Sequence, residues 1–155
     1  MIKKLAGAIR QYKKDAILSP LFVTLEVVME VVIPLLMANL IDLGIEAGDM
    51  GYIVKMGAAL ALCAVISLAF GVLSGRSAAK ASAGYASNLR KDMYYNVQRF
   101  SFSNIDKFST GSIVTRLTTD VTNVQNAFQM VIRIAVRAPM MLVFALVMAF
   151  SLNPT

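Results

Sequence analysis

The 155-residue sequence contains no histidine and a single cysteine, and both shortages restrict its chemistry. Without histidine, the chain has neither a histidine-based catalytic site nor a histidine metal site. Cys63 lies inside an apolar run, so no cysteine pair provides a disulfide framework. No segment has the Gly-x-x-x-x-Gly-Lys-Ser/Thr spacing of a phosphate-binding loop. We therefore expect that this chain is not an enzyme and that it holds no metal and no cofactor.

Charged residues are also scarce. They form 15% of the chain, whereas 57% of the residues are apolar. The mean hydropathy of +0.66 is too high for an ordinary soluble domain, in which the apolar share is about half. The composition therefore predicts a membrane protein. The formal net charge of +6 leaves nucleic-acid binding as a rival, which the positions of the charges decide.

The lysines and arginines flank the apolar runs. Those before the first run are Lys3, Lys4, Arg10, Lys13 and Lys14. Those after the second run are Arg76, Lys80, Arg90, Lys91, Arg99, Lys107 and Arg116. The short connection between the two runs is acidic, with Asp42, Glu46 and Asp49. This asymmetry predicts a multi-pass membrane protein with a cytoplasmic N-terminus, and it excludes nucleic acid as a partner because the cations form no basic groove. We expect the membrane to be the plasma (inner) membrane.

Three apolar runs predict membrane-spanning helices at about 16–41, 52–75 and 137–152. Residues 76–99 remain compatible with a helix and contain no proline, so we expect the second helix to continue far into the cytoplasm. The third helix is expected to begin near Ser112, inside a cytoplasmic loop at about 76–136. The predicted fold class is therefore an all-α membrane protein with three long transmembrane helices and cytoplasmic extensions.

Two further patterns concern helix packing. Residues 1–14 carry apolar side chains at helical spacing among five cations, which is typical of an interfacial helix but also fits a frayed basic tail. In the second helix, small residues recur every four positions, which predicts close packing against a partner helix. They are Gly57, Ala61 and Val65, and then Gly71, Gly75, Ala79 and Ala83.

Glu26 and Glu30 lie one helical turn apart within the first apolar run. Ionisable residues at membrane depth rarely face lipid. One interpretation is a cavity wall that attracts cationic amphipathic substrates. The other is structural: an ion pair with Arg133 or Arg137 of the third helix, or a protonated carboxyl group. We expect both arginines to lie at or just inside the inner membrane interface.

Residues 100–125 form a polar, basic segment between apolar stretches. An aromatic-rich turn precedes Thr110-Gly111, which is followed by Thr115-Arg116-Leu117 and then Asp120-Val121. This order resembles the first intracellular loop in the transmembrane domain of ABC exporters of the type 1 fold, and the resemblance covers essentially the whole chain. Residues 131–139 are similar to the heterodimeric bacterial multidrug branch.

The resemblance implies that residues 15–155, after an elbow at 1–14, form the N-terminal half of a six-helix transmembrane domain. It also implies a coupling helix that contacts a nucleotide-binding domain. Its residues are Ser103, Asn104, Ile105, Asp106, Lys107 and Phe108. The aromatic side chains of this turn either dock on that domain or pack the loop on its own helices. Gly111 permits a turn or a close approach, and Arg116 and Asp120 form either an i,i+4 or interhelical pair or a solvated surface pair.

By the same resemblance, the chain is expected to be the permease part of an ATP-driven exporter that moves hydrophobic or amphipathic compounds, of multidrug or lipid type, outward by alternating access. ATP and Mg²⁺ are expected on a separate nucleotide-binding domain. The other expected partners are the lipid bilayer, a second transporter half in a heterodimer, and a hydrophobic small molecule. The alternative is a non-transporting helical membrane scaffold or regulatory protein that docks a cytoplasmic partner. Three spans, where the family has six, predict a piece of a longer protein or a split gene.

Overall fold

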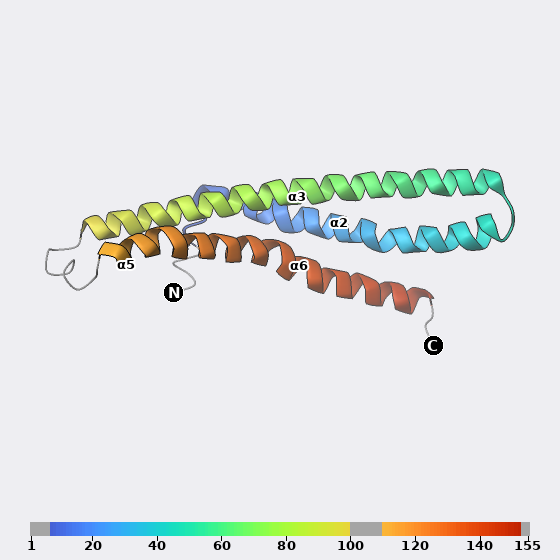
Figure 1. The fold of residues 1–155 in the computed structure, drawn as a ribbon. Helices are drawn as coiled ribbons and strands as arrows, with labels where there is room; N and C mark the ends of the chain where they lie inside the picture. Colours follow the sequence, from blue (N-terminus) through green and yellow to red (C-terminus); the bar gives the residue numbers. More distant parts are fainter. Residues whose placement is uncertain (1–6, 100–109, 153–155) are drawn as a thin grey trace.

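The structure, a computed structural model, describes residues 7–99 and 110–152, and all secondary structure in these ranges is helical (Figure 1). A short 3-10 helix, η1, leads into the first long helix. The elements in chain order are η1 (Arg10–Tyr12), α2 (Lys13–Leu40), η2 (Ile41–Ile45), α3 (Met50–Gln98), α5 (Thr110–Thr115), η3 (Arg116–Asp120) and α6 (Val121–Leu152). The predicted all-α fold is confirmed.

The connection between α2 and α3 is shorter than the sequence suggested. The π-helix η2 continues the first helix to Ile45, four residues beyond the expected end at Ile41. Gly48 then adopts a φ of 69°, a left-handed conformation that glycine reaches without a steric penalty. The carboxylate of Asp49 caps α3 by accepting hydrogen bonds from the backbone N–H groups of Gly51 and Tyr52, at 2.9 and 3.1 Å. These features fold the chain back so that α2 and α3 run antiparallel.

The predicted extension of the second helix is also confirmed. α3 is one helix of 49 residues, so at 1.5 Å per residue it is about 70 Å long, well beyond the thickness of a bilayer. α5, η3 and α6 follow one another without a break along the same direction as α2. Pro139 lies inside α6, and the C-terminal part of that helix diverges from α2 (Figure 1).

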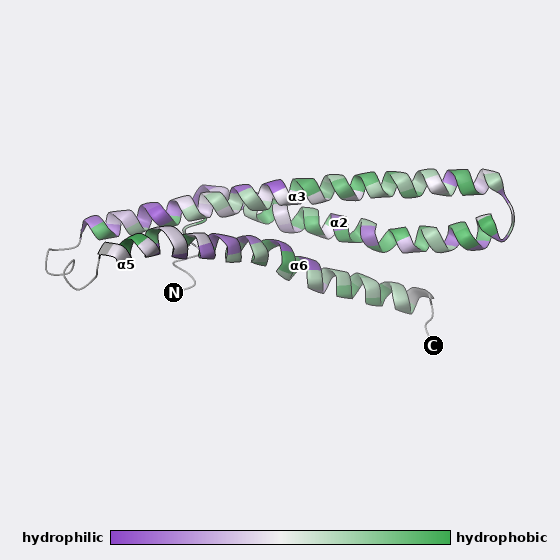
Figure 2. Cartoon of the chain, in the orientation of Figure 1, coloured by the Kyte–Doolittle hydropathy of each residue, from purple (hydrophilic) through white to green (hydrophobic). Residues whose placement is uncertain are grey.

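Three helical stretches in the described residues are long and apolar enough to cross a membrane: Arg10–Ile45, Met50–Gln98 and Gly111–Phe150. Figure 2 shows how the hydropathy is distributed along them. The half of the molecule that contains the α2–α3 connection is apolar, whereas the end at which α3 meets α5 is polar. The polar half of α3, together with α5, η3 and the N-terminal part of α6, therefore forms a two-helix extension, here called the prong, that projects beyond the apolar zone.

The packed face of α3 differs in part from the expected row of small residues. The buried residues of α3 include Ser74, Ala78, Ala81, Ser82 and Tyr85. Ala79 and Ala83 of the expected row are exposed instead. Gly71 and Gly75 do lie beside side chains of the neighbouring helices. Gly57, Ala61 and Val65 are exposed as well, so the predicted close packing is found only at Gly71 and Gly75. In the prong, the buried face of α3 is rotated around the helix relative to the expected row.

Candidate functional site

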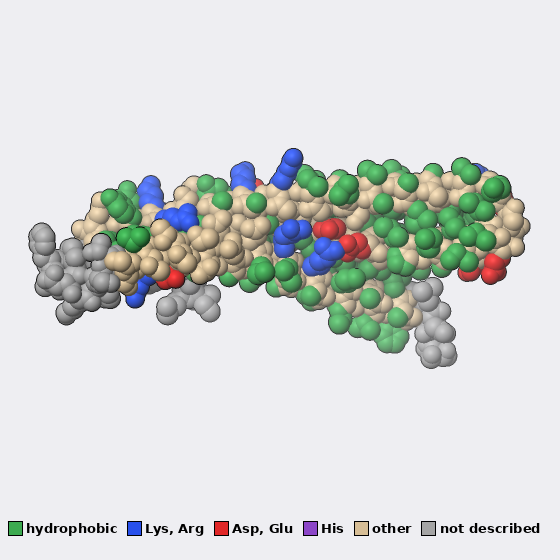
Figure 3. Space-filling view, viewed as in Figure 1, with side chains coloured by type: hydrophobic (Ala, Val, Ile, Leu, Met, Phe, Trp, Pro, Cys, Tyr) green, Lys and Arg blue, Asp and Glu red, His purple; other side chains and the backbone are tan. Residues whose placement is uncertain are grey.

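Arg137 of α6 lies between two carboxylates of α2. Its Nη1 donates a hydrogen bond to Oε1 of Glu26 at 3.2 Å, and its Nη2 donates to Oε1 of Glu30. The two glutamates are four residues apart and therefore share one face of α2, so the fork of a single guanidinium reaches both. The side chains of Glu26 and Glu30 are 12% and 30% exposed. Figure 3 shows basic and acidic side chains adjoining about midway along the molecule.

α3 contributes the space that this cluster needs. A Cβ atom at Gly71 would lie 3.1 Å from Oε1 and 3.3 Å from the carboxyl carbon of Glu26. Any larger residue would press on the carboxylate. The sequence had suggested only that Gly71 permits close helix packing, and its contact with Glu26 gives it a second role.

The remaining carboxylate oxygens are buried beside a cavity. Oε2 of Glu26 and Oε2 of Glu30 are buried and have no hydrogen-bond partner among the described residues. Both glutamates line a cavity of about 550 Å³, together with Ser67, Gly71 and Arg133. Buried polar atoms are costly unless they are hydrogen-bonded. The cavity can therefore accept a hydrogen-bond donor, such as a cationic group or ordered water.

Arg133 lies one turn before Arg137 on α6 and is half-buried. Its Nη1 would be 3.8 Å from a Cβ atom at Gly75. It lines the same cavity as Glu26 and Glu30, but within the described residues only Arg137 forms an ion pair with them. The structure thus brings together the four charged residues of the predicted intramembrane site. Among the described residues, the ion pairs of this site join Arg137 to Glu26 and Glu30 and do not include Arg133.

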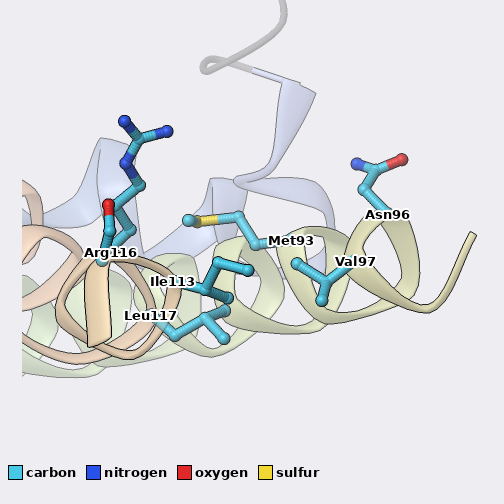
Figure 4. A pocket seen from close by; sticks show the side chains of 7 residues that line it. Met93, Asn96, Val97, Ile113, Arg116 and Leu117 are labelled. Carbon is cyan, nitrogen blue, oxygen red and sulfur yellow. The ribbon is translucent and has the colours of Figure 1, made fainter. Parts of the chain in front are cut away.

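The predicted coupling residues Ser103–Phe108 lie outside the described residues. The described helices on either side of them enclose a cavity of about 180 Å³ between the end of α3 and the α5–η3 segment (Figure 4). Its lining is largely apolar and includes Met93, Val97, Ile113 and Leu117. The cavity therefore lies at the junction that the predicted coupling helix must join.

The other prong residues singled out in the sequence lie close to this junction. Arg116 begins η3 and Asp120 ends it, and both side chains are exposed. Arg116 also lines the junction cavity (Figure 4). Gly111 lies in α5, where an added Cβ atom would meet no described atom within 4 Å. The described packing therefore provides no close approach at Gly111.

The sequence profile of the ABC transporter transmembrane region matches residues 16–155 of this chain. The matched stretch includes all of α3 and α6 and all but the first three residues of α2. The chain belongs to this family. The prong and the charge cluster described above are accordingly features of an ABC transporter transmembrane region.

Individual relatives carry names of the same kind. The chain is 33% identical to the uncharacterized ABC transporter ATP-binding protein YfiB of Bacillus subtilis over 152 residues, which are 98% of this chain and 26% of that protein. It is 27% identical to an uncharacterized ABC transporter ATP-binding protein of Mycobacterium tuberculosis over 148 residues, which are 91% of this chain and 24% of that protein. The chain thus spans about a quarter of the length of these relatives.

One contact region of this ABC transporter domain was not foreseen. The residues before and at the start of α2 lie along the prong part of α3, where the sequence had suggested an interfacial helix or a frayed tail. The buried amide of Asn88 donates to the backbone oxygen of Ala8 at 2.8 Å, and Arg10 pairs with Asp92 at 2.8 Å. We call residues 8–15 the N-terminal clasp. Partners some 80 positions apart leave no periodic signal in a single sequence.

The third packed contact of the prong is aromatic. The rings of Tyr85 on α3 and Phe128 on α6 are stacked, with centroids 4.7 Å apart. Burial raises the pKa of Tyr85 above its ordinary value of 10.0, because a buried phenolate would lose its hydration. The stack ties α3 to α6 in the prong, and the N-terminal clasp ties α2 to α3. All three helices are therefore joined outside the apolar zone.

Proposed function

We propose that this chain forms the N-terminal part of the membrane domain of an ATP-driven ABC exporter. It carries hydrophobic or amphipathic compounds, of multidrug or lipid type, outward by alternating access. ATP and Mg²⁺ bind to a separate nucleotide-binding domain. A second transporter half completes the pathway as a heterodimer in the plasma membrane, and the N-terminus is cytoplasmic.

The observation that carries this proposal is the prong. α3 and the α5–η3–α6 helix leave the apolar zone together and run side by side to the segment that contains Ser103–Phe108. A motor bound at that tip would act on two membrane helices at once, because both are continuous from the tip into the apolar zone. The names of the relatives, which call them ATP-binding proteins, support an ATP-driven partner.

The substrate class rests on the charge cluster. Two glutamates in the lining of a cavity with apolar walls favour a ligand that is largely apolar and carries a donor or a positive charge. Ile33, Leu68 and Val72 supply apolar lining beside the two glutamates. An amphipathic compound would satisfy both parts of this lining.

The test of the coupling role is Phe108→Ala in the full-length protein reconstituted into proteoliposomes. Truncating a buried aromatic anchor at an interface typically costs about 2 kcal/mol or more, so we expect substrate-stimulated ATPase activity to fall by at least about tenfold. Equilibrium binding of a lipophilic cation should stay unchanged. Tyr94→Ala is the matched control, because Tyr94 is an exposed aromatic residue of the prong outside the predicted coupling turn.

Arg116→Ala should have a smaller effect than Phe108→Ala, since we assign Arg116 to the geometry of the prong. If Phe108→Ala abolished binding and left stimulation intact, the turn would belong to a substrate site and the coupling role would be wrong. An intact protein that hydrolyses no ATP and moves no lipophilic compound would instead be a scaffold.

A further inference from the structure

A second cavity, which shares Arg133 with the glutamate cavity, has no acidic residue in its lining. It has a volume of about 400 Å³ and lies between α2 and α6. Its lining residues are Val23, Asn126, Gln129, Met130, Arg133, Ile134 and Arg137. Two guanidinium groups and two amides therefore face a space to which no carboxylate contributes.

The polar side chains that line this cavity carry more hydrogen-bond donors than acceptors. The hydroxyl of Ser82 lies 3.3 Å from Oε1 of Gln129 and 3.1 Å from the backbone oxygen of Ala79, and it can donate its one proton to either. The Nε2 group of Gln129 is a donor in either case. Arg137 is paired with two glutamates, but no described carboxylate lies within ion-pair distance of Arg133. Arg133 lines the glutamate cavity as well but forms no ion pair there, so its half-buried guanidinium can take an anionic acceptor from the side of this second cavity.

The depth of the cavity indicates which anion. Arg133 lies beside Gly75, and the next residue, Arg76, is the first basic residue after the apolar run at 52–75. One turn further along α3, Lys80 pairs with Asp15 of α2 at 3.4 Å. Arg133 is therefore level with the boundary between the apolar and the charged zones, which is where lipid phosphates lie in a bilayer.

We propose that this cavity binds the phosphate group of an anionic phospholipid. Arg133 is the principal contact, and Gln129 donates a hydrogen bond. Met130 and Ile134 supply apolar surface for the start of the acyl chains. A free phosphate ion shares the charge and the acceptors but gains nothing from these apolar residues, so the lipid is the occupant that fits the whole lining. This cavity shares Arg133 with the glutamate cavity but none of its other lining residues, and its lipid does not have to be the transported compound.

The test is native mass spectrometry of the full-length protein in detergent, titrated with phosphatidylglycerol or with zwitterionic phosphatidylcholine. We expect tighter binding of phosphatidylglycerol. Arg133→Gln should weaken that binding about fivefold, the share of one arginine near a charged membrane surface, and should leave phosphatidylcholine binding unchanged. Arg76→Gln is the matched control, because Arg76 is exposed at nearly the same depth and lines neither membrane cavity.

Two further variants keep the test decisive if Arg133→Gln folds poorly. Arg133→Lys should retain most of the binding, and Gln129→Glu should weaken it, since the new carboxylate can still accept from Ser82 but repels phosphate. An equal loss with Arg76→Gln would mean general surface attraction and would overturn the proposal. Displacement of the lipid by millimolar inorganic phosphate, at ionic strength matched with chloride, would mean that the site takes free phosphate and that the lipid assignment is wrong.

Discussion

The ring of Tyr12 lies directly against Gly84, so that a methyl group on Gly84 would overlap three atoms of the ring. Tyr12 ends η1, just before α2, and Gly84 lies on the buried face of α3. Glycine is a poor helix former, and α3 tolerates it here because it seats the ring. This contact fixes the N-terminal clasp at one level of the prong.

Gly84→Ala should therefore lower the free energy of unfolding by about 1 to 2 kcal/mol, because the loss of the ring's seat exceeds the gain in helix propensity. The measurement is unfolding in detergent by titration with a denaturing detergent. Gly57→Ala is the matched control. Gly57 also lies within α3, and an added Cβ atom would meet no described atom there within 4 Å, so alanine should be neutral or stabilising.

A double-mutant cycle sharpens this prediction. If Gly84 acts by seating Tyr12, then Tyr12→Ala should cost much less in the Gly84→Ala background than in the wild type. Additive losses would show that the two residues act independently and that the clasp is fixed elsewhere.

Arg137→Met should be clearly destabilising, because it would leave Glu26 and Glu30 without the cation that both now contact. Removing one partner of a fully buried ion pair typically costs about 3 to 5 kcal/mol, and we expect a smaller loss, about 2 kcal/mol, because the side chain of Arg137 is 38% exposed. The unfolding free energy in detergent is the quantity to measure. Adding Glu26→Gln and Glu30→Gln should recover most of the loss, because no uncompensated charge then remains.

Arg76→Met provides the comparison for Arg137→Met, since the Arg76 side chain is exposed. A surface substitution of this kind usually changes stability by less than about 0.5 kcal/mol. Equal effects of the two arginine variants would contradict a structural role for the charge cluster.

Composition and periodicity predicted the long elements because hydrophobic patterning acts locally. The absence of proline between residues 76 and 99 was enough to predict that α3 continues beyond the membrane, and it does. A charged residue in the apolar zone has few possible partners other than a residue of opposite charge there. The sequence alone therefore indicated Arg133 or Arg137 as the partner of Glu26 and Glu30. Their charges alone could not distinguish the two arginines, which lie on neighbouring turns of α6.

The sequence alone did not predict the contacts between segments that are distant along the chain. Asp15 and Lys80, or Arg10 and Asp92, are ordinary surface charges until the antiparallel packing of α2 on α3 brings them together. The sequence also did not predict the π-helical geometry of η2 and η3, because a π-helix differs from an α-helix in its backbone hydrogen bonds and not in its residue types. The distant contacts and the π-helices both depend on tertiary packing, which leaves no periodic pattern in a single sequence.

Tyr85 should make the stability of the prong sensitive to high pH. Burial raises its pKa in the folded state above the ordinary value of 10.0. The unfolded chain therefore loses this proton first, so the stabilisation is fully present below pH 10.0 and is lost as the pH rises through the folded-state pKa. Tyr85→Phe should remove this loss while keeping the stack on Phe128.

The measurement for Tyr85 is the unfolding midpoint at pH about 9 and about 11, on either side of the ordinary tyrosine pKa. The fall between the two values should be smaller in Tyr85→Phe than in the wild type. Tyr94→Phe, at an exposed tyrosine of the same helix, should behave like the wild type. A fall of unchanged size in Tyr85→Phe would assign the alkaline sensitivity to other groups.

Of the two polar contacts of the N-terminal clasp, the neutral hydrogen bond of Asn88 should contribute more stability than the ion pair between Arg10 and Asp92. Asn88 is 8% exposed and donates to the buried carbonyl of Ala8, so Asn88→Ala leaves that carbonyl unsatisfied, at a cost of about 1 to 3 kcal/mol. Arg10 and Asp92 form an ion pair whose side chains are 50% and 38% exposed, and water screens such pairs to about 1 kcal/mol or less. Hydrogen exchange of the backbone of residues 8–15 should therefore accelerate more in Asn88→Ala than in Asp92→Ala.

Asn96→Ala, at an exposed asparagine of the same helix, is the control and should leave the hydrogen exchange of residues 8–15 unchanged. A larger acceleration in Asp92→Ala would mean that the ion pair, and not the buried amide, holds the clasp on α3.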